Sequence, residues 1–575
     1  MADIVGVDSF MSCKSRPMAL EDGFIQDEKE RKSRRWFLRI GCIAVASAVW
    51  LALRTGLRPA RIVYPCQQAA LSNIQMFKMS VLALLPTTVS MRSTTTLMKP
   101  ALVLTILSVG SFFLVADPFI FDSALQQSED DYARVPISLA PHIAPTTGAA
   151  SDLFFVQNAT GYEGNLDDAV SELLDIMATQ GVGFFESITT PDGLIGSNDV
   201  VIIKVNGQWD YRGGTNTDLV KSIIKTILSH PSGFTGEVII ADNGQGIGDL
   251  DRNWANAYHR NQSAQDVVDL FAPDYDVSSI LWDNLHEFTV DDYDDGDYTD
   301  GYVRSSDWNE ETQMFVSYPK FRSSATGAYI SFKEGVWSNT TGFDSDRLKV
   351  INVPVLKSHE LYGVTACVKH YMGVPQGYIV SSVHESAPHE HFSVALGGMG
   401  TLMVETRAPV LNILDMIWVN AHPLESSLQR GPWSAYPAAR FTDILGASTD
   451  PVALDYWSAK HVLMPTSAYL NYSAFSSLDP DNESIVEHIL YPYVQQEESF
   501  HNYLTRSMSV MNDSGFQVTM NPDEINVFVS TLPDRPITYT VSEPPNPIDY
   551  LPLVLVPIAA GVLVVLVAMV RKQSK

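Results

Sequence analysis

Short runs of β-branched residues that alternate with helical segments constrain the fold of this chain most. Val200–Val205 and Val238–Ala241 are two such runs, and uninterrupted apolar stretches of this length are typical of strands buried on both faces of a parallel sheet. Between them, a glycine-rich loop leads to a predicted helix from Leu219 to Leu228, with Thr217 as its expected N-cap. This order predicts βαβ units, and therefore an α/β fold with an open, mostly parallel sheet and helices on both faces.

The segment Lys349–Gly377 gathers basic residues in an otherwise acidic chain. Val350–Leu356 predicts a further buried strand, and a helix-compatible run, Val364–Met372, follows Gly363. The two lysines and two histidines of this unit are Lys357, His359, Lys369 and His370. Free backbone N–H groups at a helix N-terminus, together with cationic side chains, favour a bound anion. The alternative is a strand edge whose lysines are merely solvated.

Several segments together resemble the domain of unknown function 362 family. The sequence VPVLKSHELYGVTACVKHYMGVPQG resembles the central signature of that family, and the similarity extends to VVIIKVN, VIIADNGQG, LNILDMIW and ASTDPVALDYW. In order and spacing these segments run from Asn198 to Lys460. The resemblance implies no particular reaction, because the chemistry of the family is unassigned. Some members carry ferredoxin-like cysteine motifs, from which this chain departs.

Polar residues at the ends of the predicted strands are the candidate site, because ligands of open α/β sheets bind beyond the carboxyl ends of the strands. The candidate catalytic residues are His359, Asp242 and Asp415, and the candidate substrate-binding residues are Lys204, Asn206, Lys357 and Lys369, with His370 beside them. Lysines with neighbouring amides can neutralise a phosphate or a carboxylate. A histidine whose pKa is lowered by those cations can act as a base, and the aspartates can orient it or hold a metal.

Two further segments are candidate metal sites. A divalent metal is therefore a candidate cofactor, although the sequence does not define its ligands. The loop Asp291–Tyr302 does not have EF-hand spacing, which leaves a calcium loop of another type or a solvated acidic loop. His384–Glu385 and His389–His391 either contribute ligands to a divalent metal or lie on the surface. A thiolate iron–sulfur cluster is not expected, because the 4 cysteines include no C-x-x-C pair.

Both ends of the chain carry features of membrane targeting. Ser33–Arg39 precedes the apolar run Ile40–Leu53, a pattern similar to a twin-arginine export signal, with an ordinary first membrane helix as the alternative. Leu551–Val570 is an uncharged run of spanning length, and the basic residues Arg571 and Lys572 after it place the tail in the cytoplasm. We therefore expect a protein of the cell membrane whose main domain is extracytoplasmic, with the twin-arginine translocase as a partner during export.

The expected organisation follows from these segments. In order, it comprises a cytoplasmic tail (1–35), a membrane region of one to three spans (36–120), a linker (121–150), an external α/β domain with an acidic insertion at about 250–348 (151–541), a stalk (542–550), a transmembrane helix (551–570) and a cytoplasmic tail (571–575). N-x-S/T sequons that are compatible with a glycosylated surface all fall in the external domain: Asn158, Asn261, Asn339, Asn471, Asn482 and Asn512.

Two classes of function remain open. The first is a membrane-anchored extracytoplasmic enzyme that acts on a small anionic substrate, with or without a metal. The second is a non-catalytic surface receptor or scaffold that uses the same site for binding. Nucleic acid is not an expected partner, because the net charge is −28 and phosphate backbones require a basic face. The reaction type does not follow from the residues, since the chain lacks a nucleophile elbow, a Walker loop and a dinucleotide fingerprint.

Overall fold

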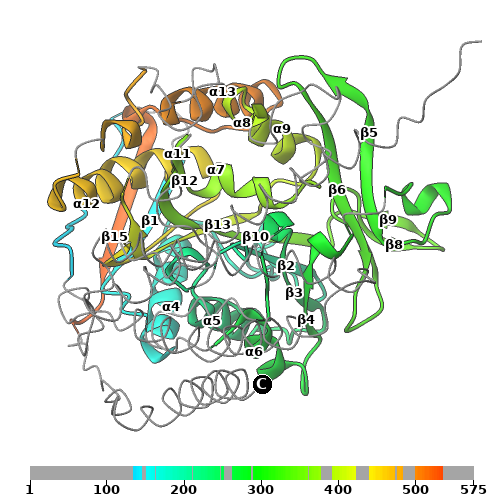
Figure 1. Cartoon of the computed structure of the whole chain (residues 1–575). Helices are drawn as coiled ribbons and strands as arrows, with labels where there is room; N and C mark the ends of the chain where they lie inside the picture. Colours follow the sequence, from blue (N-terminus) through cyan, green and yellow to red (C-terminus); the bar gives the residue numbers. More distant parts are fainter. Residues whose placement is uncertain are drawn as a thin grey trace, which may run out of the picture. The chain divides into compact units, whose positions relative to one another are not determined.

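A 10-stranded mixed sheet forms the centre of the structure (Figure 1). The strands lie in the order β15 (Ile525–Thr531), β1 (Ser151–Gln157), β14 (Ala439–Ser448), β13 (Leu411–Asn420), β10 (Leu348–Val353), β2 (Val200–Val205), β3 (Glu237–Asp242) and β4 (Val277–Leu281). Strand β14 is antiparallel to both neighbours, and the other neighbouring pairs in this order are parallel. The mostly parallel α/β sheet expected from the sequence is confirmed.

The computed structural model describes residues 134–145, 151–161, 163–209, 211–246, 248–251, 262–285, 289–359, 362–376, 392–422, 439–472, 475–483 and 499–534. All of them lie in a single unit that extends from Glu129 to Thr538. No helix in this part of the chain combines the length and the hydrophobicity that crossing a bilayer requires. The predicted membrane region, stalk and C-terminal transmembrane helix lie outside the described residues.

The two faces of the sheet are covered by two separate hydrophobic cores. Val201 and Ile203 of β2 point to one face, where they pack with the apolar side chains of α4 (Glu163–Thr179), α5 (Thr217–Leu228) and α6 (Ala264–Phe271). Val200 and Ile202 point to the other face, toward the layer drawn above the sheet in Figure 1. The helices of that layer are α7 (Cys367–His370), α8 (Phe392–Ala395), α9 (Gly398–Glu405), α11 (Pro451–Ser458), α12 (Met464–Tyr469) and α13 (Phe500–Asp513). Helices on both faces were expected and are present.

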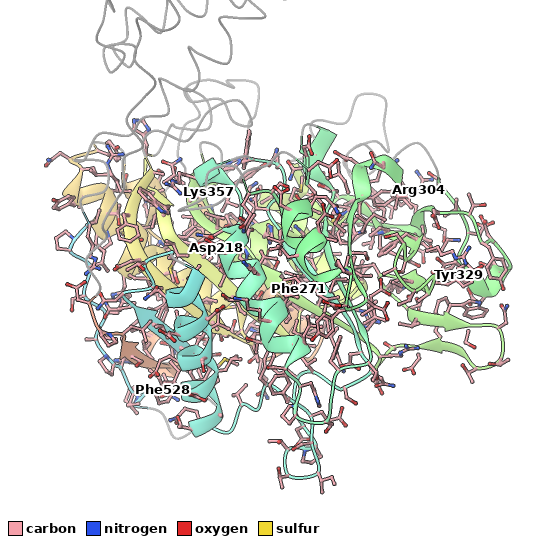
Figure 2. The ribbon with its side chains drawn as sticks, turned by 90° about the horizontal axis from the view of Figure 1, so that it is seen from below. Asp218, Phe271, Arg304, Tyr329, Lys357 and Phe528 are labelled. Atoms are coloured by element: carbon pink, nitrogen blue, oxygen red, sulfur yellow. The ribbon has the colours of Figure 1, made fainter. Side chains whose placement is uncertain are left out.

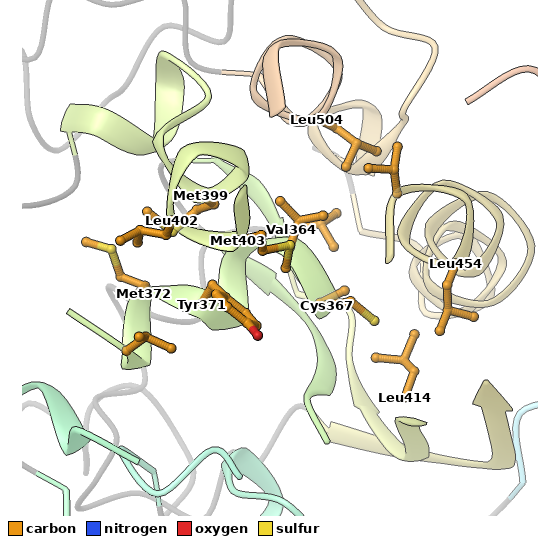
Figure 3. Close-up of a cluster of buried hydrophobic side chains, with 14 of the residues drawn as sticks. Val364, Cys367, Tyr371, Met372, Met399, Leu402, Met403, Leu414, Leu454 and Leu504 are labelled. Carbon is orange, nitrogen blue, oxygen red and sulfur yellow. The ribbon is translucent and has the colours of Figure 1, made fainter. Parts of the chain in front are cut away.

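The second core is built largely from segments that lie far apart in the sequence. Figure 3 shows Leu414 of β13, Cys367 of α7, Leu454 of α11 and Leu504 of α13 as members of one buried cluster. Met399 of α9 belongs to the same cluster. The burial of these side chains anchors α7 against the sheet, although α7 is a single turn that could not be stable alone.

The signature segment differs from the expected strand, loop and helix. Val350–Leu356 is not one strand, because Pro354 has no N–H group for a sheet ladder and interrupts it. The chain forms β10 before this proline and β11 (Val355–His359) after it. Beyond a short connection it returns as β12 (Gly363–Thr365), antiparallel to β11. The helix therefore starts only at Cys367, and its predicted first residues belong to a hairpin.

The N-cap of α5 also differs from the expectation by one residue. The side chain of Asn216, rather than that of Thr217, accepts hydrogen bonds from the N–H groups of Asp218 and Leu219. Either residue type can cap a helix. The N–H group of Asn216 donates to the Asp415 carboxylate, and this contact holds Asn216 at the start of α5. Asp450 is the N-cap of α11, with Pro451 in the first turn, an order that suits the start of a helix because proline needs no N–H partner there.

The region 250–348 contains more regular structure than loops and short strands. Its first part supplies α6 and β4 to the main fold, and its second part forms a 5-stranded antiparallel sheet. The strands of this second sheet are β5 (Gly301–Asn309), β6 (Met314–Arg322), β7 (Tyr329–Ser331), β8 (Gly335–Ser338) and β9 (Gly342–Asp344). Figure 2 shows Tyr329 of this sheet on the side of the unit opposite to Phe528 of β15.

Candidate functional site

Four polar side chains form a row across the main sheet. Asn352 of β10 is paired in register with Lys204 of β2 on one side and with Asn412 of β13 on the other, and Asn412 is paired with Ser448 of β14. Residues in register on adjacent strands project to the same face, and all four are buried. A polar line therefore crosses a sheet whose neighbouring positions are apolar.

Hydrogen bonds along this row fix the orientation of His370. The Asn412 amide donates to the Ser448 carbonyl (3.2 Å), and its Oδ1 accepts from the Asn352 amide (2.9 Å). The Asn352 amide also donates to the Cys367 carbonyl, which leaves its Oδ1 to face Nδ1 of His370 at 2.7 Å. Because a carbonyl oxygen can only accept, Nδ1 must carry the proton. Nε2 of the neutral ring then accepts from the Lys204 ammonium at 3.2 Å.

Lys204 and Asp242 form a buried ion pair at the end of this row. The Lys204 ammonium donates to Oδ1 of Asp242 at 2.8 Å, while Oδ2 accepts from the Gly207 N–H at 2.8 Å. Burial lowers the pKa of Lys204, and the charge of Asp242 opposes this effect. Lys204 also donates to the Val205 carbonyl at 3.3 Å. Its three N–H groups are thus engaged inside the protein, which gives Lys204 a positioning role rather than that of a direct anion ligand.

Gly373 packs directly on this ion pair. A Cβ atom at this position would lie 2.2 Å from Oδ1 of Asp242 and 2.4 Å from Nζ of Lys204. Any larger residue would therefore separate the two charges or push the backbone away. The adjacent Asn243 ties the same segment down, since its amide donates to the carbonyls of Met372 and Pro375.

Lys357 and Lys369 add two buried lysine side chains beside the ion pair. The Lys357 ammonium donates to the Gly213 carbonyl at 2.8 Å and lies 5.6 Å from the centre of the Trp209 ring. Burial lowers the pKa of Lys357 well below its ordinary value, and the charges of Lys369 and Lys204 lower it further, against the effect of Asp242. Burial likewise lowers the pKa of His370, as do the same neighbouring lysines. We call Lys204, Asp242, Lys357, Lys369 and His370 the cationic cluster.

The predicted base His359 lies at the margin of the cationic cluster. Its ring packs against that of Tyr362 at 5.4 Å between centroids, and its Nδ1 accepts from the Tyr362 N–H. The Lys369 ammonium lies 5.6 Å from the centre of the same Tyr362 ring. His359 is therefore linked to the cluster through an aromatic ring, whereas His370 contacts Lys204 directly.

Asp415 and Asn206 lie near the cluster, but their contacts differ from those expected. Asp415 is in the middle of β13 rather than after a strand, and its carboxylate accepts from the N–H groups of Asn216 and Ile417. Burial raises its pKa to about 6, against these hydrogen bonds. Asn206 is buried at the end of β2, and its Oδ1 accepts no hydrogen bond from the described residues. Asn206 thus retains an acceptor for a ligand, while Asp415 fixes the start of α5.

The N-terminus of α7 does not offer free N–H groups to an external anion. The N–H groups of Cys367 and Val368 donate to the carboxylate of Asp455 on α11, at 2.6 and 2.9 Å. The expected anion is therefore supplied by the protein itself. Burial raises the pKa of Asp455 to about 7, against these hydrogen bonds.

Neither candidate metal site gains a ligand set from the described residues. The loop after Asp291 closes on Lys320, whose ammonium donates to the carbonyls of Asp291 and Asp297 and lies 4.6 Å from the ring centre of Tyr293. A lysine thus supplies the positive charge that a calcium ion would bring. Within the described ranges, no group of three His, Cys, Asp or Glu side chains could hold a metal ion. The histidine-rich segment 384–391 lies outside those ranges.

Several residues of the site were missed by the sequence analysis. Asn352 and Asn412 lie inside strands, where an asparagine is unusual, and this misfit was an available signal. Gly373 is different, because it contacts Lys204 and Asp242, which are distant from it in the chain. A single sequence holds no signal for such contacts.

Comparison with known proteins identifies the region that contains most of the cluster. Residues 339–460 match the family described as Domain of unknown function (DUF362). No curated protein and no solved structure matches the chain. The matched segment carries β10–β14, α7 and α11, and the match supports the resemblance to that family seen in the sequence.

Proposed function

We propose that this chain is an enzyme that binds a small phosphate- or carboxylate-bearing substrate beside Lys357 and Lys369. One observation carries the proposal: three lysines and a histidine converge with Asp242 in the buried cationic cluster. Like charges in a poorly solvated place raise one another's free energy. A bound anion would offset this repulsion and would allow Lys357 to take up its full charge.

The other groups have roles that follow from their contacts. Lys204 and Asp242 hold His370 in one tautomer, and Asn352 holds the opposite ring nitrogen. Asn206 offers a carbonyl oxygen to a hydroxyl group of the substrate. In this proposal His370 is a stronger acid–base candidate than His359, because it belongs to the charge network directly.

Calorimetry with inorganic phosphate and with succinate tests the binding step. Binding is expected to take up protons, because an anion raises the lowered pKa of Lys357, so the measured enthalpy should change with the ionisation enthalpy of the buffer. Lys357→Met should abolish this dependence and weaken binding at least tenfold. Lys333→Met, a change at an exposed lysine, is the matched control and should leave binding unaltered. Equal binding by both variants would refute the proposed site.

A non-catalytic receptor is the second candidate, and one observation favours it. Both nitrogens of His370 and both oxygens of Asp415 already have internal partners. Groups held in this way suit a rigid binding site, whereas a proton-transfer step requires one of these bonds to open. Turnover of phosphate esters by the purified chain, lost in Lys357→Met, would distinguish the enzyme from the receptor.

We also propose that the domain lies outside the cell membrane, anchored at its ends. The support is the pair Arg34–Arg35 before an apolar run, and the uncharged stretch Leu551–Val570 before Arg571 and Lys572. The segment 384–391 is the candidate donor set for a divalent metal, and elemental analysis of the purified chain tests that part of the proposal.

A further inference from the structure

The sequons of the chain differ sharply in how their asparagine side chains are held. The Asn158 amide donates to the Leu532 carbonyl at 2.6 Å, and Thr160 of the same sequon is buried. The Asn512 amide donates to the Val518 carbonyl at 2.9 Å, and its Oδ1 accepts from the Val518 N–H. The Asn482 amide donates to the Ser476 carbonyl. At these three positions the amide nitrogen already has an internal acceptor.

Asn339 has the opposite arrangement. It begins the exposed turn 339–341 between β8 and β9, where Ser338 pairs with Gly342. Gly342 has a φ of 78°, as expected for the residue that closes a three-residue hairpin turn. Thr340 and Thr341 are exposed as well, so that the whole Asn-Thr-Thr sequon is accessible.

Two aromatic side chains fix the orientation of the Asn339 amide. The indole Nε1 of Trp337 lies 3.2 Å from its Oδ1, and the Tyr298 hydroxyl donates to the same oxygen. An indole N–H can only donate, so the atom that it contacts must be the carbonyl oxygen. Nδ2 is consequently the end of the amide that points away from these partners. The Trp337 ring lies 4.7 Å from that of Phe343, so both rings belong to the hairpin that carries the turn.

We propose that Asn339 is an N-glycosylation site, and that the amide is held ready for modification by Trp337 and Tyr298. The inference rests on the external location of the domain proposed above. The sugar donor is a glycosyl group carried on a lipid phosphate or diphosphate. Nδ2 forms a bond to C1 of the sugar, the bond between C1 and the phosphate oxygen breaks, and the lipid phosphate leaves with the electron pair. One amide proton passes to a base of the transferase.

The product keeps the contacts that orient it. Oδ1 remains a carbonyl oxygen after the reaction and still accepts from Trp337 and Tyr298. Modification at Asn158 or Asn512 would instead break existing hydrogen bonds inside the protein.

Peptide mass spectrometry of the full chain, purified from the cells that produce it, tests this inference. The peptide that contains Asn339 should carry the added mass of sugar residues, and the peptides with Asn158 and Asn512 should not. Thr341→Ala should remove the modification without changing Asn339 or its two contacts, whereas Thr341→Ser should retain it.

Protease treatment of intact cells, in the same preparation, separates the inference from its premise. An unmodified Asn339 in a domain that external protease removes would overturn the inference and leave the location intact. An unmodified Asn339 in a domain that is protected until lysis would overturn both. A sugar on Asn158 would contradict the inference that internal hydrogen bonds of the asparagine side chain prevent modification.

Discussion

Two asparagines decide how His370 is presented to the cationic cluster. Asn352 accepts from the ring at 2.7 Å and donates to Asn412 at 2.9 Å. Because the three side chains are buried, each one depends on its neighbours for a hydrogen-bond partner. The network is therefore expected to behave as a unit when a member is replaced.

Asn352→Leu should lower the free energy of unfolding by about 2–4 kcal/mol, because it leaves His370 Nδ1–H and Asn412 Oδ1 without partners. Asn352→Leu combined with Asn412→Leu should cost less than the sum of the two single changes, since the second change removes one of these orphaned groups. Urea unfolding of the four proteins measures the coupling. Strict additivity would show that the asparagines act independently.

Gly373→Ala should disrupt the Lys204–Asp242 ion pair. The added Cβ would fall 2.2 Å from Asp242 Oδ1, and relief of such a contact costs about 1–3 kcal/mol. The variant is expected to unfold at lower urea concentration and to lose anion binding. Gly164→Ala is the control, since a Cβ there meets no atom within 4 Å and α4 should gain up to about 1 kcal/mol. A Gly373→Ala protein that binds phosphate normally would contradict the close packing.

At the scale of elements, α7 depends on a carboxylate from another helix. Asp455 of α11 accepts from the first N–H groups of α7, and its pKa is raised by burial to about 7 from an ordinary 3.8. The native state therefore binds this proton more strongly than the unfolded chain does. The stability contribution is fully present below about pH 4 and is lost as the pH rises to about 7.

Asp455→Asn should reduce this part of the pH dependence, because an amide oxygen can still accept a hydrogen bond but carries no titrating charge. Between pH 4 and pH 8 the loss of stability in the parent chain should exceed that in the variant by on the order of 3 kcal/mol. Thermal unfolding at several pH values measures the difference. Parallel pH profiles for the two proteins would contradict the assignment of a raised pKa to Asp455.

The elements that could be predicted from the sequence are those whose own residues show a clear pattern of buried and exposed positions. Strand β2 was predicted with its observed bounds, and β3 within one residue at each end, because both are apolar and buried on both faces. The hairpin β11–β12 was not predicted, since Val364 and Thr365 suit a strand or a helix equally in isolation. Similarly, Lys204, Asp242 and Lys357 could be predicted to lie close together, because each one is near the end of a predicted strand. The partners of Asp415 could not be predicted, because they depend on the path of the loop before α5.

At the scale of the whole molecule, the described domain has both of its ends in one place. β1 and β15 are parallel neighbours, with Ser151 opposite Ile525 and Gln157 opposite Thr531. The preceding segment joins the same edge, since His142 pairs with Val527. The first and last described residues meet at this edge, where the Arg134 guanidinium donates to the Asp534 carboxylate at 3.2 Å.

Replacement of Arg34 and Arg35 by lysine should abolish delivery of the domain to the outside. A twin-arginine translocase reads the arginines themselves, whereas an ordinary signal anchor responds to charge, which lysine preserves. Digestion by protease added to intact cells measures delivery, and the parent chain should be cleaved while the double variant is protected. Equal cleavage of both proteins would assign export to the ordinary route.

The pairing of β1 with β14 and β15 also determines when the main sheet can be completed during synthesis. β1 lacks its neighbour β14 until the ribosome has passed Ser448, and its second neighbour β15 until the ribosome has passed Thr531. At roughly 5–20 residues per second, the first strand waits on the order of tens of seconds for its last partner. An export pathway that accepts only folded domains must therefore delay export during this interval, although the N-terminal signal leaves the ribosome first. Any chaperone that protects this chain would be needed at the uncovered edges of β1 during that interval.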